Sequence, residues 1–311
     1  MATINIDSLA GADDNARLTA AYAAVSGTDT IVFPGHTYEF ENLQRTWDKN
    51  NVTWQGVPGT KFRISNPSGS GAGDRVSWYI DSNNTTFNNI EFEFVDNSTG
   101  NMALWPIYRQ PTHTGITFTD CAFTDSRTWT YTPGATPNTD GTWNSTWSHQ
   151  NGAAQRGRYV STLLNMGAAE SSDINVNLTL TGCTMHHLFN GITVPRGVGG
   201  TTVQKCTFIG HWGEQGSTSS GADGNSIWME GHNFTVGGAT QSLGNTFRDN
   251  DVANGSMLNR AINMEGRGAS GASTADPATV RNNTIEQCGS RINFTYIEAD
   301  ETTGGGTSGT I

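Results

Sequence analysis

The sequence predicts an all-β fold, a parallel β-helix in which the chain winds into stacked coils of short strands. Its 311 residues include 38 Gly and only 14% charged residues, a composition that suits strands and tight turns better than helices. Small and amide residues recur at one position of successive segments, and similar strand sequences follow them. Repeats that are tens of residues long are typical of a solenoid. The recurring position is expected to contain Asn89, Cys121, Cys183, Cys206, Asn245 and Asn283.

Residues 1–29 are expected to form the N-terminal entry to the solenoid, with a short capping helix. The segment 11–27, "GADDNARLTAAYAAVSG", has Asp13 or Asp14 near the start of the predicted helix. The following segment 30–40, "TIVFPGHTYEF", predicts two strands joined by a Pro-Gly turn. The apolar face of the helix is expected to contain Leu18, Tyr22 and Val25.

Four later segments predict equivalent strands of successive coils: "GITVP" (191–195), "SIWME" (226–230), "AINME" (261–265) and "RINFT" (291–295). Side chains alternate along a strand, so two sets of positions are expected in the core. They are Ile192, Ile227, Ile262 and Ile292, and Val194, Met229, Met264 and Phe294. The positions between and after them are expected to face outward. They are Thr193, Trp228, Asn263 and Asn293, and Pro195, Glu230, Glu265 and Thr295.

The β-helix is expected to run from residue 30 to residue 300. A long polar insertion at 127–159 and a Gly/Thr-rich exit segment at 301–311 complete the chain. Cys121, Cys183 and Cys206 are interpreted as small core residues, with a disulfide or a metal site as the alternative. Recurrent Asn-X-Thr triplets are interpreted as Asn turns leading into Thr-rich strands rather than as glycosylation sites.

The acidic helix followed by "TIVFPGHTY" resembles the start of the pectate-lyase-like right-handed parallel β-helix superfamily, to which many bacteriophage tailspikes and polysaccharide-degrading enzymes belong. The resemblance covers roughly residues 8–300 and implies a right-handed solenoid acting on a polysaccharide. Spikes of this kind assemble as trimers, which implies a homotrimer. No signal peptide is visible, and the ending "TTGGGTSGTI" is similar to a virion spike, so a virion or extracellular location is expected.

The motif Met-Glu-Gly occurs twice, at Glu230 and at Glu265, at the same place of two predicted coils. Neighbouring strands lie about 4.8 Å apart, so the two carboxylates are expected to interact. Two negative charges at such a separation raise the pKa of one of them. A protonated acid beside an ionised carboxylate is what glycoside hydrolysis requires. Glu230 and Glu265 are therefore candidate catalytic residues.

Basic residues surround this pair. His232 and Arg267 follow the two glutamates by two residues, and Arg196 lies near the equivalent place of the preceding coil. These bases could hold a sugar carboxylate, act in a lyase reaction, or neutralise the glutamates as a structural ladder. Oxygen ligands from Glu230, Glu265 and Asn263 would also suit Ca²⁺. No other metal or cofactor is expected.

Aromatic side chains supply the candidate sugar-binding surface, because exposed rings stack on pyranose rings. The alternatives are that each Trp covers the base of a loop, or that the long insertion makes a subunit contact. The candidate substrate-binding residues are Trp228, Asn263, Trp212, Arg196, Tyr296, Trp143 and Trp147.

The net charge of −11 argues against nucleic-acid binding, and no apolar run is long enough to insert into a membrane. Three functions are compatible with the sequence. A glycoside hydrolase using Glu230 and Glu265 is favoured, because the negative charge would repel a polyanionic glycan. A lyase on a uronate-containing glycan would use His232, Arg196 or Arg267. The third is a non-catalytic glycan-binding or structural β-helix.

Overall fold

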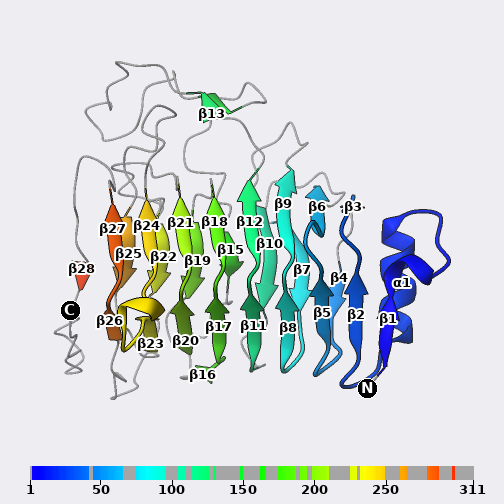
Figure 1. Cartoon of the computed structure of the whole chain (residues 1–311), viewed down its shortest axis with the longest axis horizontal. Helices are drawn as coiled ribbons and strands as arrows, with labels where there is room; N and C mark the ends of the chain where they lie inside the picture. Colours follow the sequence, from blue (N-terminus) through cyan, green and yellow to red (C-terminus); the bar gives the residue numbers. More distant parts are fainter. Residues whose placement is uncertain are drawn as a thin grey trace.

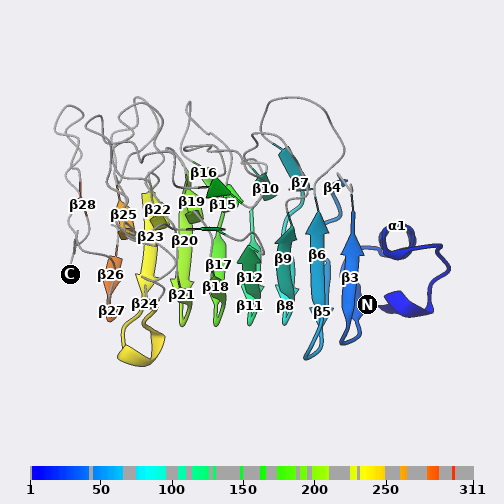
Figure 2. The same ribbon diagram turned by 90° about the horizontal axis from the view of Figure 1, so that it is seen from above.

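The chain forms a parallel β-helix, as the sequence predicts. In the computed structural model three long parallel sheets, A, B and C, run along the molecule (Figure 1; Figure 2). The chain passes through one strand of each sheet and then begins the next coil, from β2–β3–β4 to β26–β27–β28. The structure describes residues 2–41, 45–65, 75–95, 104–109, 114–125, 129–130, 148–149, 162–165, 174–186, 190–194, 198–209, 225–229, 232–248, 260–264, 279–286 and 296–297.

Each strand is short, as the composition predicts. Sheet A contains β1 (Thr3–Asn5), β2 (Thr30–Phe33), β5 (Thr53–Gly56), β8 (Thr85–Asn88), β11 (Ile116–Thr119), β17 (Leu178–Thr181), β20 (Val198–Gln204), β23 (His232–Gly237) and β26 (Thr279–Arg281), with β16 (Ile174–Asn175) beside β20. Sheet B contains β3 (Thr37–Phe40), β6 (Lys61–Ser65), β9 (Glu91–Val95), β12 (Ala122–Asp125), β18 (Thr184–His186), β21 (Thr207–Ile209), β24 (Thr246–Arg248) and β27 (Thr284–Glu286). Sheet C contains β4 (Arg45–Trp47), β7 (Arg75–Ile80), β10 (Leu104–Arg109), β15 (Thr162–Asn165), β19 (Asn190–Val194), β22 (Asn225–Met229), β25 (Arg260–Met264) and β28 (Tyr296–Ile297).

A short helical cap covers the N-terminal end of the solenoid (Figure 1). It consists of the 3₁₀ turn η1 (Ile6–Ser8) and the predicted helix α1 (Asp14–Ala24). The Asp13 side chain accepts a hydrogen bond from the Ala16 N–H at 2.8 Å, which satisfies a free donor at the helix start. Leu18 is buried, and the ring of Tyr22 packs edge-on against Trp47 at 4.7 Å. No helix in the described part of the chain is long and apolar enough to cross a membrane.

Aromatic rings of equivalent positions stack on one another in the core. The rings of Phe87 and Phe118 are nearly parallel, with centroids 4.9 Å apart. This separation equals the spacing between neighbouring parallel strands, so the stacking follows directly from the in-register pairing. The same geometry recurs for Phe92 with Phe123, at 5.0 Å, and for Phe208 with Phe247, at 4.8 Å.

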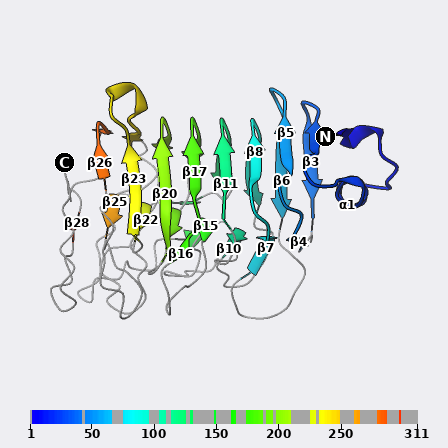
Figure 3. The ribbon, with the colours of Figure 1, turned by 90° about the horizontal axis from the view of Figure 1, so that it is seen from below.

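The outer face of sheet A carries threonine at one position of every strand on the main path of the sheet, and Figure 3 shows these strands side by side. Thr combines high β-propensity with a side chain that packs against an identical neighbour across strands. The threonine column contains Thr3, Thr30, Thr53, Thr86, Thr117, Thr179, Thr202, Thr235 and Thr279.

The turn before sheet A explains the Asn-X-Thr triplets. Asn84, Asn177 and Asn233 all have a left-handed backbone, with φ of 56°, 48° and 47°. Asn tolerates this conformation better than most residues with a side chain. In each triplet the threonine two residues later belongs to the threonine column. These three triplets therefore encode a left-handed residue at the entry to a strand of sheet A, which agrees with the interpretation from the sequence.

The recurring small residues form the predicted inward column at the start of sheet B. Cys121, Cys183 and Cys206 are buried and free, which confirms their assignment to the core. One member was predicted wrongly. Ile90 occupies the column because Glu91 pairs with Ala122. Asn89 instead forms the preceding turn, with φ of 54°.

Asn245 and Asn283 continue this column as an amide ladder. The Asn245 Nδ2 donates to the Val203 carbonyl at 2.9 Å, and its Oδ1 accepts from the Cys206 N–H at 2.9 Å. Asn283 Nδ2 repeats the first contact one coil later, donating to the Val236 carbonyl at 3.0 Å. Each amide satisfies backbone groups that the turn leaves unpaired inside the molecule.

The register of the last coil differs from the prediction. Tyr296 pairs with Asn263 and Ile297 with Met264, whereas the sequence pattern aligned Asn293 with Asn263. Ile292, Phe294 and Thr295 lie outside the described residues. The segment "RINFTYI" carries apolar residues in both alternation phases, so its pattern fits two registers. Pairing with β25, which periodicity alone does not reveal, decides between them.

Replacing Asn245 tests the amide ladder. Asn245→Ala leaves the Cys206 N–H and the Val203 carbonyl without their partner in a buried place, so the free energy of unfolding is expected to fall by about 2–4 kcal/mol. Asn88→Ala is the control, because its amide bonds only to Gln55 on the outer face. It should cost about 1 kcal/mol or less. Equal losses in urea unfolding would contradict the ladder's role.

Candidate functional site

Sheet C aligns three of the predicted substrate-binding positions, Trp228, Asn263 and Tyr296. One position of each strand of sheet C pairs with its equivalent in the next coil. This outer column of sheet C contains Thr46, Tyr79, Tyr108, Asn165, Thr193, Trp228, Asn263 and Tyr296. Trp47, Ile80, Val194 and Met229 are buried at the next position. Because side chains alternate along a strand, we predict that the column faces outward. Thr46, its first member, is exposed.

The outer column has a composition suited to sugars. Four of its positions are aromatic, two are amides and two are threonines, and none is charged. Aromatic rings provide apolar faces, and amides and hydroxyls donate and accept hydrogen bonds. With one position about every 4.8 Å, the column offers a linear series of contacts along the solenoid axis.

The structure adds residues to the set of substrate-binding candidates predicted from the sequence. Trp228, Asn263 and Tyr296 were candidates from the sequence, and their strands place them at equivalent positions. Tyr79 and Tyr108 are directly paired members that sequence reasoning missed. The segments "RVSWYI" and "LWPIYR" lack the repeated Met-Glu motif, so only the pairing of β10 with β7 and with β15 reveals their phase.

The predicted catalytic glutamates follow this column in the chain. Met229, Met264 and Ile297 occupy equivalent positions at the ends of their strands. The next residue in the sequence is glutamate each time: Glu230, Glu265 and Glu298. All three glutamates lie outside the described residues, so the spacing of their carboxylates remains a prediction. The corrected register of β28 is what adds Glu298 to the pair that the sequence suggested.

The other predicted site residues do not all belong to sheet C. His232 begins β23 and pairs with Gly199 in sheet A, so it belongs to a different sheet from Trp228. Of the long insertion, the structure describes the antiparallel pair β13 (Trp129–Thr130) and β14 (Ser148–His149). The candidates outside the described residues are Arg196, Arg267, Trp212, Trp143 and Trp147.

The calcium hypothesis remains a prediction. Its proposed ligands are Asn263, of which only the backbone position is described, and Glu230 and Glu265, which lie outside the described residues. Within the described ranges no group of three or more His, Cys, Asp or Glu side chains is arranged to hold a metal ion.

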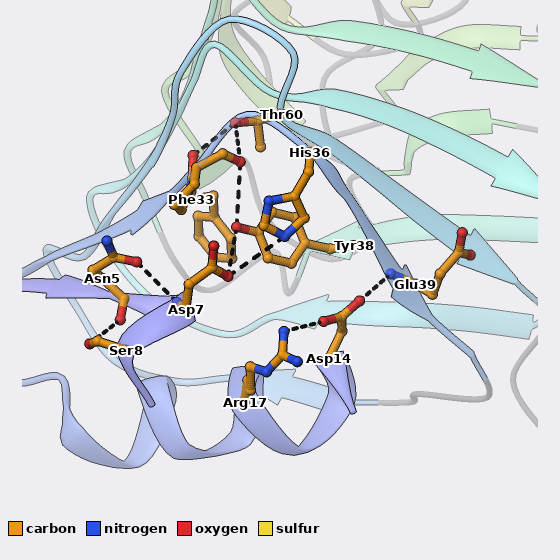
Figure 4. Close-up of polar contacts among 11 residues, drawn as sticks. Asn5, Asp7, Ser8, Asp14, Arg17, Phe33, His36, Tyr38, Glu39 and Thr60 are labelled. Carbon is orange, nitrogen blue, oxygen red and sulfur yellow. Dashed lines mark hydrogen bonds and ion pairs between the residues drawn. The ribbon is translucent and has the colours of Figure 1, made fainter. Parts of the chain in front are cut away.

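A compact polar cluster of ionisable side chains lies near the cap (Figure 4). The Tyr38 hydroxyl donates to Asp7 Oδ1 at 3.2 Å, and His36 Nε2 lies 3.6 Å from the same oxygen. Burial, followed by the Asp7 carboxylate, raises the pKa of Tyr38 above its usual value. Tyr38 therefore stays protonated as a hydrogen-bond donor, which does not suit acid–base work near neutral pH.

The neighbouring contacts show what this cluster does. Asp14 in α1 accepts from Arg17 at 2.9 Å through Oδ1, and from the Glu39 N–H at 2.9 Å through Oδ2 (Figure 4). Asp7 in η1 holds Tyr38 of β3 in the same way. Both carboxylates thus tie the helical cap to the first strand of sheet B. The cluster is an anchor for the cap.

The outer face of sheet B carries cations that are already paired. Lys61 Nζ lies 3.0 Å from Glu91 and 3.5 Å from Glu93, and Arg63 lies 3.0 Å from Glu93 and 2.9 Å from Glu39. This alternation of charges along three coils neutralises the surface locally. It does not provide the excess positive charge that a polyanionic glycan would require.

Comparison with known proteins supports the fold. The chain matches no protein-family model and no curated protein sequence. Its structure is similar to that of a pectin methylesterase mutant in complex with a hexasaccharide, with a TM-score of 0.52 and 9% identity over 95% of this chain and 80% of that chain.

Two alginate lyases are also similar at lower scores. One, from Paenibacillus sp. FPU-7, has a TM-score of 0.41 and 13% identity over 96% of this chain and 98% of that chain. The other is a PL6 enzyme in complex with a trisaccharide. It has a TM-score of 0.46 and 11% identity over 92% of this chain and 54% of that chain. At 9% identity, the likeness to the pectin methylesterase shows the parallel β-helix fold alone.

Removing the Tyr38 hydroxyl tests the anchoring role of the polar cluster. Tyr38→Phe keeps the buried ring and loses the hydrogen bond to Asp7, so the free energy of unfolding should fall by about 1 kcal/mol. Binding of any glycan that the protein recognises should be unchanged. Loss of glycan binding without loss of stability, measured by calorimetry and thermal melting, would show that the cluster is a functional site.

Proposed function

We propose that the protein binds a polysaccharide along the outer column of sheet C and hydrolyses it. The observation that carries this proposal is the alignment of Tyr79, Tyr108, Trp228 and Tyr296 with amides and hydroxyls in a single uncharged column. An extended glycan lying across the strands would meet a new side chain about every 4.8 Å. This spacing is close to the length of one pyranose unit, so each coil could contact one sugar.

The catalytic groups proposed are Glu230 and Glu265, with Glu298 as a further carboxylate one coil on. One protonated glutamate would donate its proton to the glycosidic oxygen, and a second, ionised glutamate would act as nucleophile or as base for a water molecule. Carboxyls one coil apart, at about 5 Å, suit a retaining mechanism, whereas Glu230 and Glu298, two coils apart at about 9.6 Å, suit an inverting one. The anomeric form of the first product distinguishes the two pairs.

The proposal includes the setting of the reaction. A bacterial surface or extracellular glycan is the proposed substrate class, acted on by a homotrimeric, tailspike-like protein on a virion or outside the cell. No cofactor is required for the hydrolysis, although Ca²⁺ at Asn263 and the neighbouring glutamates remains part of the proposal. Elimination by His232, Arg196 or Arg267, and binding without turnover, are the alternative outcomes of the experiments below.

Binding to the outer column is tested by removing single rings. Tyr108→Ala and Trp228→Ala should each weaken binding of a recognised glycan about tenfold, because each removes one stacking contact. Thr86→Ala, in the threonine column of sheet A, is the control and should leave affinity unchanged. Calorimetry on a panel of bacterial and algal glycans measures both. Equal affinities for all three variants and the parent chain would place the binding surface elsewhere.

Catalysis is tested by removing the charge of each glutamate. Glu230→Gln and Glu265→Gln should each lower turnover about 10²-fold or more, because acid–base and nucleophilic roles both require the carboxyl group. Thermal stability should stay the same or rise, since a repulsion between like charges is removed. Reducing ends and ultraviolet absorbance are recorded together, because a new alkene band marks elimination. Full activity in both variants would rule out this pair.

A further inference from the structure

Three buried thiols stack in consecutive coils and take no part in the function proposed above. Cys121, Cys183 and Cys206 each directly precede a strand of sheet B, and each side chain is at most 2% exposed. The Thr184 N–H donates to the Cys121 carbonyl at 2.9 Å, and the Thr207 N–H donates to the Cys183 carbonyl at 2.8 Å. These backbone contacts hold the three residues at the same phase of neighbouring coils.

The stack ends on both sides with residues that carry no sulfur. Ile90 occupies the equivalent place one coil before Cys121, and Asn245 occupies it one coil after Cys206. Strand β18, which follows Cys183, pairs with β12, which follows Cys121, and with β21, which follows Cys206. Cys183 is therefore the central sulfur, and the outer two are separated by it.

The strand spacing decides which sulfur pairs can bond. Residues paired in register on neighbouring strands lie about 4.8 Å apart, within the usual Cα separation of a disulfide, about 4.4–6.8 Å. Cys121 and Cys206 are two strands apart, at about 9.6 Å, beyond the limit of about 7 Å. A disulfide in this stack must include Cys183, and only one can form at a time.

The surroundings also select the reactive sulfur. Hydrogen bonds from Cys121 and Cys206 lower the pKa of the Cys183 thiol, whereas burial raises the pKa of the two outer thiols. The thiolate is the nucleophilic form of cysteine. Cys183 is thus the shared partner, and its two neighbours favour its thiolate.

We propose that Cys121, Cys183 and Cys206 form an oxidisable site, in which hydrogen peroxide converts Cys183 and one neighbour to a disulfide that crosslinks two coils. The Cys183 thiolate attacks one peroxide oxygen, the O–O bond breaks, and hydroxide leaves, which gives a sulfenic acid. The neighbouring thiol then attacks the Cys183 sulfur. The hydroxyl group leaves with the thiol proton as water. Overall, two thiols and one peroxide yield one disulfide and two waters.

The consequence of oxidation differs between the two products. A Cys183–Cys206 bond closes one coil, whereas a Cys121–Cys183 bond also encloses the long insertion at 127–159. Either crosslink restricts the unfolded chain, so the oxidised protein should melt at a higher temperature unless the bond strains the core.

The test counts thiols in the full chain. Cys288, the fourth cysteine, is replaced by serine in every variant so that the count reports on the stack alone. The folded protein is treated with hydrogen peroxide, denatured, labelled with a thiol reagent, and mapped as unreduced peptides by mass spectrometry. The expected result is a fall from three thiols to one, with Cys183 linked to Cys121 or to Cys206.

Two matched variants make the outcome specific. Cys183→Ser should keep both remaining thiols under the same treatment, because Cys121 and Cys206 cannot reach each other. Cys121→Ser should lose both of its thiols by forming the Cys183–Cys206 bond. Circular dichroism before treatment confirms that each variant is folded, and the parent chain oxidised in urea confirms that the oxidant suffices. Retention of three thiols in the folded parent, or a Cys121–Cys206 linkage, would overturn the proposal.

Discussion

In-register pairing of parallel strands between successive coils is the interaction on which the rest of the structure depends. Because each residue pairs with the residue of the same phase in the next coil, a single sequence position becomes a column along the molecule. Stacked Phe87 and Phe118 are one such column in the core, and the threonines of sheet A are another on the surface. The outer column of sheet C follows from the same rule.

Local turns hold this register in place. Left-handed residues at the entry to sheet A, such as Asn84 and Asn177, bend the chain at the same phase of several coils. Inside the molecule, Asn245 satisfies backbone groups of the preceding coil, so a slip of one residue would leave them unpaired. At the N-terminal end, α1 covers the first coil. Asp7 and Asp14 fix η1 and α1 to β3.

The sequence predicts the columns where one residue type repeats and misses those where types vary. Ile192, Ile227 and Ile262 align as expected, because an apolar residue marks each coil. Tyr79 and Tyr108 belong to the outer column of sheet C, yet no repeated motif links them to Trp228. Their phase depends on strand pairing across a long insertion, which periodicity does not encode.

In the last coil, alternation in the sequence predicted the wrong register for the strand. The segment before Tyr296 carries a plausible alternation that ends in the wrong register, so Asn293 was predicted where Tyr296 pairs. Pairing of Tyr296 with Asn263 adds a fourth aromatic residue to the outer column. In the sequence a third glutamate, Glu298, directly follows this strand.

The most direct test of this account is an experimental structure with a recognised oligosaccharide bound. The account predicts that the sugar chain runs parallel to the solenoid axis, crosses the strands of sheet C, and contacts Tyr108, Trp228 and Tyr296. A sugar chain that lies along a single strand, or that binds on sheet A or sheet B, would contradict it.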